Sequence, residues 1–320
     1  MKPVWVILIL LGTLLLLLFI AIFAVLRVAC RRGKPLGVDI EKQLAHSAFR
    51  QFTPMIIEAR SWLERMPHEL VSTQSFDGLR LAARYVPCEN ARGTILLFHG
   101  WRSYPEVDFG AAFAFYHGQG LNLLLVDQRA QGSSQGHYIT FGIRERRDVA
   151  TWVTWHNAHF GADIPLLISG LSMGATTVLM AAGNPLAANV RGVIADCGFT
   201  SPAGIIGKLA RENHIPAAPV LFLLNLETRL FAGFGLKEYS TLTALQQTTL
   251  PVFFAHGEAD TFVPCEMTKR NYAACASKDK TLLLVPGAGH GQSYLIQPEQ
   301  YRAMVCAFLE RTLGASKTNS

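Results

Sequence analysis

A serine stands at the tip of a tight turn between a predicted strand and a predicted helix. The strand is 165–169, the turn is Gly170-Leu171-Ser172-Met173-Gly174, and the helix is 175–182. Glycines two residues to either side of Ser172 relieve a turn too sharp for bulky neighbours and let the strand and helix pack closely. The pattern is typical of a nucleophile elbow, in which the amide of Met173 can also bind an oxyanion.

A nucleophilic serine requires a histidine that takes its proton and a carboxylate that orients this histidine. Both follow in the order Ser, Asp, His, each just beyond a predicted strand. The strand 251–255 leads into the loop that contains Asp260, and the strand 281–285 leads into a glycine-rich loop that contains His290. We therefore predict that Ser172, Asp260 and His290 form a catalytic triad.

Two other carboxylates are rivals for the acid. Asp196 follows the predicted strand 190–195, from which a carboxylate could also reach the histidine. We expect it instead to shape the edge of the site or to cap the next segment. Glu258 lies two residues before Asp260, and we expect it to face solvent.

A second oxyanion donor is predicted after the apolar run 92–98, which ends in His99-Gly100-Trp101. A His-Gly pair after this strand lets the backbone approach the substrate. We predict that the Trp101 N–H is the donor. His99 is expected to be structural and to hold the loop by a hydrogen bond.

The rest of the chain supplies the elements of a mostly parallel sheet. Asp77-Gly78 between two apolar segments indicates a β-hairpin at the antiparallel edge. We expect Asp127 and Arg129 to hold the active-site loop as an ion pair. The remaining predicted elements are strands at 71–76, 79–86 and 121–126 and a helix at 142–160.

Five motifs carry a family resemblance: His99-Gly100-Trp101; the run 127–136 (Asp-Gln-Arg-Ala-Gln-Gly-Ser-Ser-Gln-Gly); the elbow 170–174; 256–260 (His-Gly-Glu-Ala-Asp) with Val263-Pro264; and Gly289-His290. Together they resemble the serine-hydrolase branch of the α/β-hydrolase superfamily over about residues 70–312. The resemblance is nearest to membrane-anchored bacterial hydrolases of the serine-aminopeptidase-like or lysophospholipase-like type, related to the BEM46 group.

This resemblance implies an α/β-hydrolase fold, an acyl-serine intermediate, and neither a metal nor an organic cofactor. It does not imply a substrate, because the family includes esterases, lipases, thioesterases and peptidases. The second motif departs from the family at Gln131, where histidine is usual, and that position is not catalytic. Six cysteines without C-x-x-C spacing support neither a metal site nor a disulfide framework.

An uncleaved membrane anchor is predicted at the N-terminus. Val4 to Leu26 is a stretch of 23 uncharged, mostly apolar residues, enough to span a hydrocarbon core of about 30 Å. A cleaved signal peptide would have a shorter apolar core and a small-residue cleavage site. We expect an anchor with its basic flank at 1–35, a helical linker at 36–69, a hydrolase domain at 70–314 and a tail at 315–320.

The net charge of +6 comes mostly from this N-terminal region, where Lys2, Arg27, Arg31, Arg32 and Lys34 are the charged residues of the first 35. Basicity here indicates a membrane flank rather than nucleic-acid binding. More positive charge follows the helix than precedes it, which favours a cytoplasmic catalytic domain, although a Met-Lys start resembles a secretory n-region. The sequence does not determine the oligomeric state.

The insertion at about 199–245, which we call the cap, is unusually apolar. Its side chains must be buried against the core, the bilayer or a ligand. Ordinary packing is one interpretation, and a lid over an acyl-accommodating pocket is the other.

The sequence thus predicts a membrane-anchored serine hydrolase of a small or lipid-like ester with an apolar acyl group. A peptidase or amidase is the alternative, although Glu212 and Glu227 are few acidic residues for binding an amine. A catalytically silent membrane-tethered binding protein would have a broken triad. A dehalogenase or epoxide hydrolase would carry aspartate at the elbow in place of Ser172.

Overall fold

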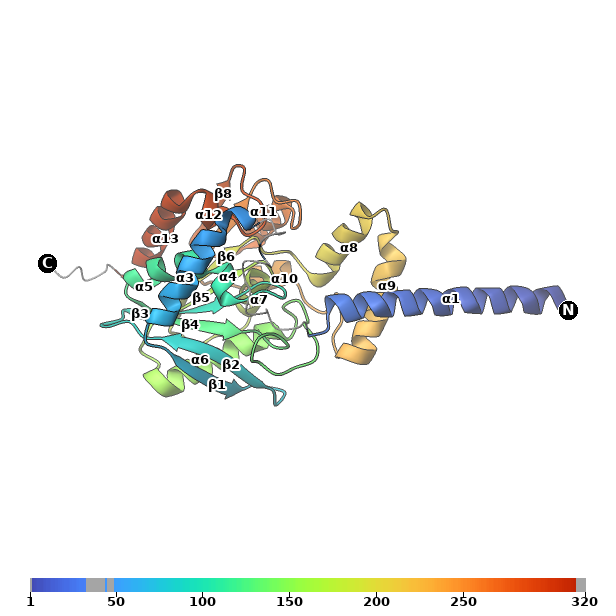
Figure 1. The fold of residues 1–320 in the computed structure, drawn as a ribbon, viewed down its shortest axis with the longest axis horizontal. Helices are drawn as coiled ribbons and strands as arrows, with labels where there is room; N and C mark the ends of the chain where they lie inside the picture. Colours follow the sequence, from blue (N-terminus) through green and yellow to red (C-terminus); the bar gives the residue numbers. More distant parts are fainter. Residues whose placement is uncertain (1, 33–43, 45–48, 315–320) are drawn as a thin grey trace.

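The computed structural model describes residues 2–32, 44 and 49–314, and its centre is one eight-stranded sheet (Figure 1). The strand order is β1-β2-β4-β3-β5-β6-β7-β8. β2 pairs antiparallel with both β1 and β4, and every other pairing is parallel. The strands are β1 (Glu69–Gln74), β2 (Arg80–Val86), β3 (Gly93–Phe98), β4 (Leu121–Asp127), β5 (Leu166–Leu171), β6 (Val190–Asp196), β7 (Val252–Gly257) and β8 (Lys280–Val285).

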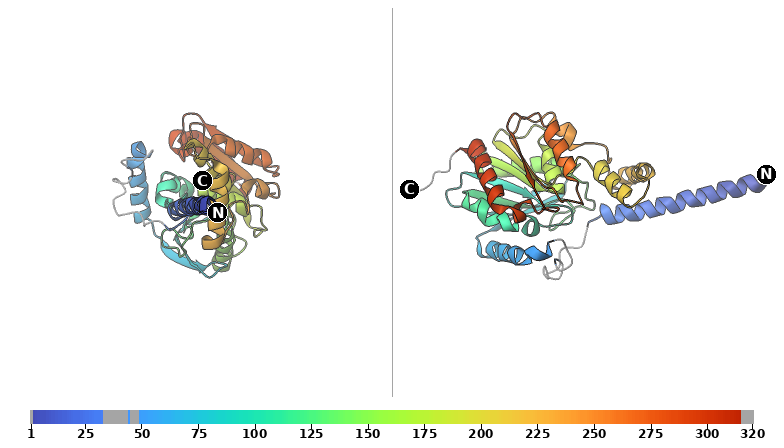
Figure 2. Two further views of the ribbon diagram at one scale, coloured as in Figure 1. Left: turned by 90° about the vertical axis from the view of Figure 1, so that its right-hand side faces the viewer. Right: turned by 90° about the horizontal axis from the view of Figure 1, so that it is seen from above.

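Helices cover both faces of the sheet, and two further helices lie between the sheet and the free end of α1 (Figures 1 and 2). The helices are α1 (Lys2–Ala29), η1 (Arg50–Phe52), α3 (Thr53–Arg65), α4 (Pro105–Asp108), α5 (Gly110–Gly118), α6 (Glu145–Phe160), α7 (Met173–Ala181), α8 (Pro202–Glu212), α9 (Ala217–Glu227), the π-helical turn η2 (Thr228–Ala232), α10 (Thr241–Leu245), α11 (Cys265–Ala274), α12 (Ser293–Ile296) and α13 (Pro298–Leu313).

The central strands read as unbroken apolar runs because both of their faces are covered. In β3, Ile95 and Leu97 pack with α3, α5 and α13 in one core cluster, while Leu96 and Phe98 pack with α6 and α7 in a second cluster. Trp152 of α6 is fully buried on the second face. The alternation of side chains along each strand therefore builds two cores from one sequence run.

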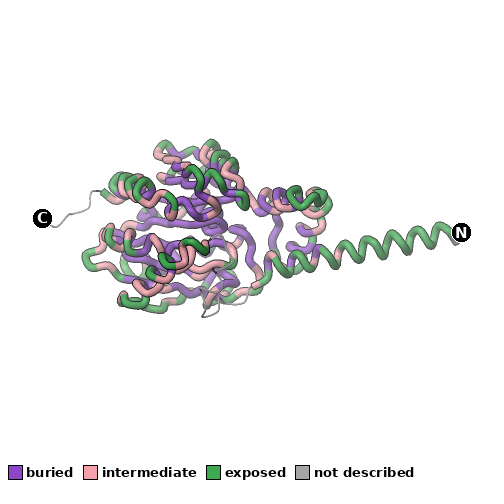
Figure 3. Tube along the Cα trace, turned by 45° about the horizontal axis from the view of Figure 1, so that its top comes forward, coloured by how far each residue is buried: buried purple, intermediate pink, exposed green. Residues whose placement is uncertain are grey.

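A third apolar cluster lies outside this sandwich and joins α1 to the cap. It contains Ile22 and Leu26 of α1, Leu224 of α9 and Met173 of the elbow. The chain leaves α1 directly onto the loop after β4, where Ile139 N–H donates to the Cys30 carbonyl at 2.5 Å and Arg31 forms a bridge with Tyr138. Figure 3 shows the change from this buried junction to the exposed N-terminal part of α1.

The α/β fold class predicted from the sequence is confirmed, as is the hairpin at Asp77-Gly78. Several boundaries differ: the predicted strand 71–76 is observed at 69–74, so β1 begins inside the predicted linker, the predicted helix 175–182 is observed at 173–181, and the predicted helix 142–160 begins at Glu145. The first turn expected at 142–144 instead belongs to the preceding loop. Residues 33–43 and 45–48 of the linker, and the tail 315–320, lie outside the described residues.

Candidate active site

Ser172 lies between β5 and α7 in the strained backbone conformation that an elbow requires. Its φ is 55° and its ψ is −115°, a region that residues other than glycine rarely adopt. The Ser172 N–H donates to the Asp196 carbonyl at 2.8 Å, and the Ser172 carbonyl accepts from Thr176 N–H at 3.0 Å. A Cβ at Gly170 would overlap the backbone of Gly174, and one at Gly174 would overlap the Phe98 carbonyl. Both glycines are therefore required by close backbone packing.

The three residues predicted as a triad are brought together at the carboxyl end of the sheet. His290 Nε2 lies 2.9 Å from Ser172 Oγ, and His290 Nδ1 lies 2.7 Å from Asp260 Oδ2. The carboxylate can only accept, so Nδ1 carries the proton and Nε2 is left to accept the serine proton. Ser172 is 5% exposed. This chain of hydrogen bonds has the geometry needed for general-base activation of a serine.

Asp260 is a buried anion held by several donors. Its Oδ1 accepts from the Phe262 and Val263 amides at 2.8 and 2.9 Å. His256 Nε2 lies 3.1 Å from Oδ2 and 2.9 Å from the Val263 carbonyl, and since both neighbours are acceptors, this nitrogen donates. Burial alone would raise the pKa of Asp260, but the hydrogen bonds from His256 and His290 hold it well below its usual value.

The rival carboxylates have other roles in the structure. Asp196 is buried and accepts a hydrogen bond from Ser293 Oγ at 2.8 Å. Burial raises its pKa to about 6, which disfavours the ionised form that would orient a histidine. Glu258 is exposed, as predicted.

The loop after β3 presents three successive amides with different fates. The Gly100 N–H donates to Asp108 Oδ2 at 2.6 Å, and the Arg102 N–H donates to Gln131 Oε1 at 2.6 Å. Between them, the Trp101 N–H donates to no protein group in the described part of the chain, and the Met173 N–H is likewise unengaged there. A Cβ at Gly100 would lie 3.4 Å from Ser172 Cβ, so this loop directly adjoins the elbow.

The Trp101 side chain connects the same loop to α1, because its indole Nε1 donates to the Ala29 carbonyl at 2.7 Å. His99 is fully buried; its Nδ1 lies 2.8 Å from the Gly100 carbonyl, and its Nε2 accepts from Gln128 N–H at 3.3 Å. This agrees with the structural role predicted for His99.

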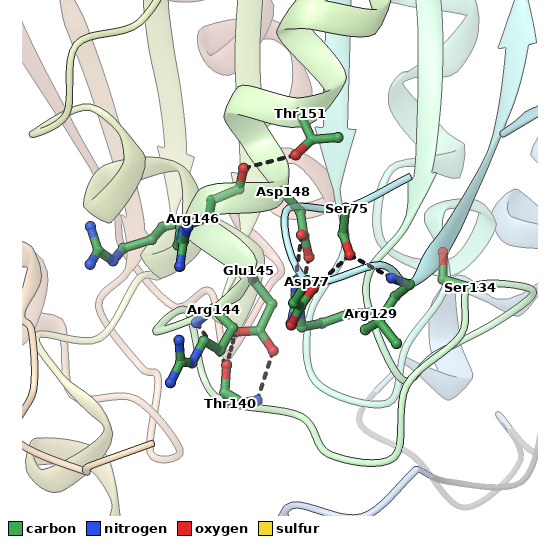
Figure 4. Close-up of polar contacts among 12 residues, drawn as sticks. Ser75, Asp77, Arg129, Ser134, Thr140, Arg144, Glu145, Arg146, Asp148 and Thr151 are labelled. Carbon is green, nitrogen blue, oxygen red and sulfur yellow. Dashed lines mark hydrogen bonds and ion pairs between the residues drawn. The ribbon is translucent and has the colours of Figure 1, made fainter. Parts of the chain in front are cut away.

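The ion pair expected between Asp127 and Arg129 is wrong. Arg129 instead contacts Asp148 of α6 at 2.6 Å and Asp77 of the β1–β2 turn at 2.9 Å (Figure 4). Asp127 accepts from the Ser133 N–H at 2.8 Å. The two residues were paired because they are close in sequence, but their side chains contact different neighbours in the fold.

Three supporting residues were missed by the sequence interpretation. Asp108 holds the loop by accepting hydrogen bonds from the Gly100 amide and Ser103 Oγ. Glu145 accepts from the Thr140 amide (Figure 4) and from the Gly142 amide. His256 orients Asp260, as described above. Only His256 had a sequence signal, since it belongs to the motif 256–260 that also contains the acid.

Cys197, Asp260 and His290 place ligand-type atoms within 4.8 Å of one another, a grouping that could in principle hold a metal ion. Asp260 and His290 are already hydrogen-bonded to each other through the atoms a metal would need. Burial raises the pKa of the Cys197 thiol well above its usual value, so the thiolate that binds metals is disfavoured. These residues fit a hydrogen-bonded triad better than a metal centre.

No protein-family model matches the chain. Among curated relatives, it is 26% identical over 265 residues to the uncharacterized protein YqkD of Bacillus subtilis, covering 80% of this chain and 82% of that protein. It is also 28% identical over 247 residues to the uncharacterized protein Rv2307c of Mycobacterium tuberculosis, covering 76% and 79%.

Solved structures share the fold at lower sequence identity. The Pyrococcus furiosus esterase Pf2001 matches with a TM-score of 0.66 at 20% identity, covering 89% of this chain and 98% of the esterase. Est1E from Butyrivibrio proteoclasticus, solved with ferulic acid, matches with 0.58 at 18%, covering 77% and 100%. Mouse alpha/beta hydrolase domain-containing protein 10 matches with 0.56 at 18%, covering 76% and 99%. From its sheet order, its elbow and these neighbours, the chain has the α/β-hydrolase fold.

Proposed function

We propose that this protein is a serine hydrolase that cleaves a carboxylic ester through an acyl-serine intermediate. The observation that carries the proposal is the continuous hydrogen-bond chain from Ser172 through His290 to Asp260. The structural likeness to esterases is consistent with this reaction. No metal or organic cofactor takes part in it.

The proposed reaction uses the groups in fixed order. His290 Nε2 takes the proton of Ser172 as Oγ attacks the carbonyl carbon, and Asp260 stabilises the resulting imidazolium. The unengaged Trp101 and Met173 amides donate to the oxyanion, each such donor being worth about 3 kcal/mol in the transition state. His290 then protonates the leaving alcohol and later activates the water that releases the acid.

We also propose that α1 anchors the enzyme in a membrane as a single span. Pro3–Ala29 has the length and apolar composition of such a helix. The arginines at 27, 31 and 32 favour a cytoplasmic catalytic domain. In sealed right-side-out vesicles the domain should be protected from added protease, and in inverted vesicles it should be digested. The reverse pattern would contradict the assigned side.

The test of the reaction is labelling and turnover by the full-length protein in detergent. Wild type should react with a fluorophosphonate probe and hydrolyse short p-nitrophenyl esters, while Ser172→Ala should abolish labelling and lower kcat by about 10⁴-fold or more. Ser72→Ala, at an exposed serine on β1, is the matched control. Full activity of Ser172→Ala would refute the proposal, and faster cleavage of aminoacyl amides than of esters would favour the amidase alternative.

A further inference from the structure

The cap carries a row of large apolar side chains that point away from the protein. Phe222, Leu226 and Leu230 follow one another at intervals of four residues, so they share one side of α9 and its continuation η2. Their exposed fractions are 71, 42 and 64%, and Ile215, just before α9, is 49% exposed. We call these four residues the outer cap face. Leu224, on the opposite side of α9, is fully buried.

The outer cap face is continuous with the proposed anchor. α9 packs against α1, and Ile22 and Leu26 share a cluster with Leu224. In the continuation η2, the ring of Phe231 meets that of Phe23 edge to face at 5.1 Å. Both Figures 1 and 2 place α8 and α9 on the side of the sheet from which α1 projects, and in Figure 1 α9 runs across α1 rather than along it. A helix crossing the anchor in this way would lie nearly in the plane of a bilayer.

The length of α1 determines the depth of that plane. From Val4 to Leu18 every side chain is exposed, a stretch of about 22 Å at about 1.5 Å per residue. A hydrocarbon core is about 30 Å thick, so the span must extend to about the level of Ile22 and Phe23. These are the residues that contact the cap. Exposed Arg27 lies beyond this level, where it can reach lipid headgroups.

The same contacts lead inward to the reaction site. Met173, which follows the nucleophile, and Trp101 belong to the apolar cluster that contains Ile22, Leu26 and Leu224. The Trp101 indole is bonded to the last turn of α1. One apolar cluster therefore extends from α1 and the cap to the residue that follows Ser172.

We propose that the outer cap face is immersed in the bilayer and that the enzyme takes a lipid ester directly from the membrane. This inference rests on the membrane anchoring and ester hydrolysis proposed above, and it names the membrane as the source of the substrate. The occupant of the outer cap face is lipid, because the face adjoins a bilayer-spanning helix at the depth where hydrocarbon ends.

The depth is tested by photocrosslinking of the full-length protein in phospholipid vesicles. p-Benzoylphenylalanine is introduced singly at Phe222, at Leu10 in the anchor, and at Leu70, an exposed leucine of β1. Lipid adducts are expected at Phe222 and Leu10 and at background level at Leu70. Adducts at Leu10 without any at Phe222 would overturn the immersion alone. Absence of adducts at Leu10 would overturn the anchor and the immersion together.

The source of substrate is tested by comparing two esters on the same vesicles. Phe222→Asp should lower kcat/KM for a vesicle-borne diacylglycerol-type ester by about tenfold or more, because a charge would enter the interface. The rate with a short soluble p-nitrophenyl ester should hold within about twofold. Phe222→Leu should restore the first rate, and Leu70→Asp is the matched control. Equal losses on both esters, or no loss on either, would overturn the proposal, whereas wild type inactive on both esters would refute the hydrolase itself.

Discussion

The predicted triad and the junction between α1 and the cap lie next to each other but differ in how their buried polar groups are paired. At the triad, buried polar groups are satisfied inside the protein: Asp260 accepts from two amides and two histidines. At the junction of α1 and α9, Glu227 is fully buried and neither of its carboxylate oxygens has a hydrogen-bond partner among the described residues. In the first region the buried polar groups are paired within the protein, whereas the second region exposes apolar side chains and buries an unpaired carboxylic acid.

The largest expected effect is a loss of activity on replacing the carboxylate of Asp260. Asp260→Asn should lower kcat/KM for a soluble ester by about 10⁴-fold, because the amide favours the wrong tautomer of His290. Steady-state kinetics in detergent measure the loss. Asp279→Asn, at a half-buried aspartate paired with Arg311, serves as control. A loss below about tenfold would mean that another group orients the histidine.

At the junction of α1 and α9, by contrast, neutralising a carboxylate should increase the stability of the folded protein. Burial raises the pKa of Glu227 to about 7, so the folded protein retains a proton that the unfolded chain releases near pH 4. Stability is therefore lost as pH rises from about 4 to 7, and Glu227→Gln should restore on the order of 2 kcal/mol above pH 7. Thermal unfolding in detergent between pH 5 and 8 measures this gain.

Glu212→Gln provides the comparison for that measurement, since Glu212 is exposed and paired with Lys208 at 2.6 Å. Its effect should be small at every pH. A destabilising Glu227→Gln would show that the carboxylate has a hydrogen-bond partner in the folded protein.

A smaller effect of the same sign is expected beside the triad. The pKa of Asp196 is raised to about 6 by burial, so its contribution to stability falls as pH rises from about 4 to 6. Asp196→Asn keeps an acceptor for Ser293 and should add about 1–2 kcal/mol to the free energy of unfolding above pH 6.

Asp260, whose pKa is lowered, stabilises the fold above about pH 4 and loses this effect in acid, so Asp260→Asn should reduce stability at neutral pH. Parallel pH profiles for the two variants would contradict the different environments assigned to them.

The least effect should arise where the two regions meet. Trp101→Phe removes the indole hydrogen bond to the Ala29 carbonyl and leaves a smaller aromatic ring in its place. A net loss of about 1 kcal/mol corresponds to about a fivefold lower kcat if the bond positions the Trp101 amide. Equal kcat with a lowered unfolding midpoint would indicate that the bond only stabilises the junction.

The fold, and the meeting of the three residues predicted as a triad, were accessible from the sequence because they depend on local order: an apolar run, a turn and a polar residue after it. Their catalytic role stays a prediction. Ser172, Asp260 and His290 each follow a strand that periodicity identifies. The supports of the site were not accessible. Asp108 and Arg129 reach their partners through packing between distant elements, and no spacing rule pairs Arg129 with Asp77, which lies 52 residues away. The predicted roles of Trp101 and Met173 as oxyanion donors stay predictions.

The direct passage from α1 onto the body leaves the two parts little freedom to turn relative to each other. The Cys30 carbonyl accepts a hydrogen bond from the Ile139 amide, and the Arg31 carbonyl accepts one from the Arg102 side chain. The Arg32 side chain donates to the carbonyls of Gly132 and Ser134. A catalytic domain on a flexible linker could adopt many orientations relative to the membrane surface. A chain braced in this way and held in a bilayer would instead keep one orientation and one height, so its encounters with substrate would be set by lateral diffusion of lipid in two dimensions.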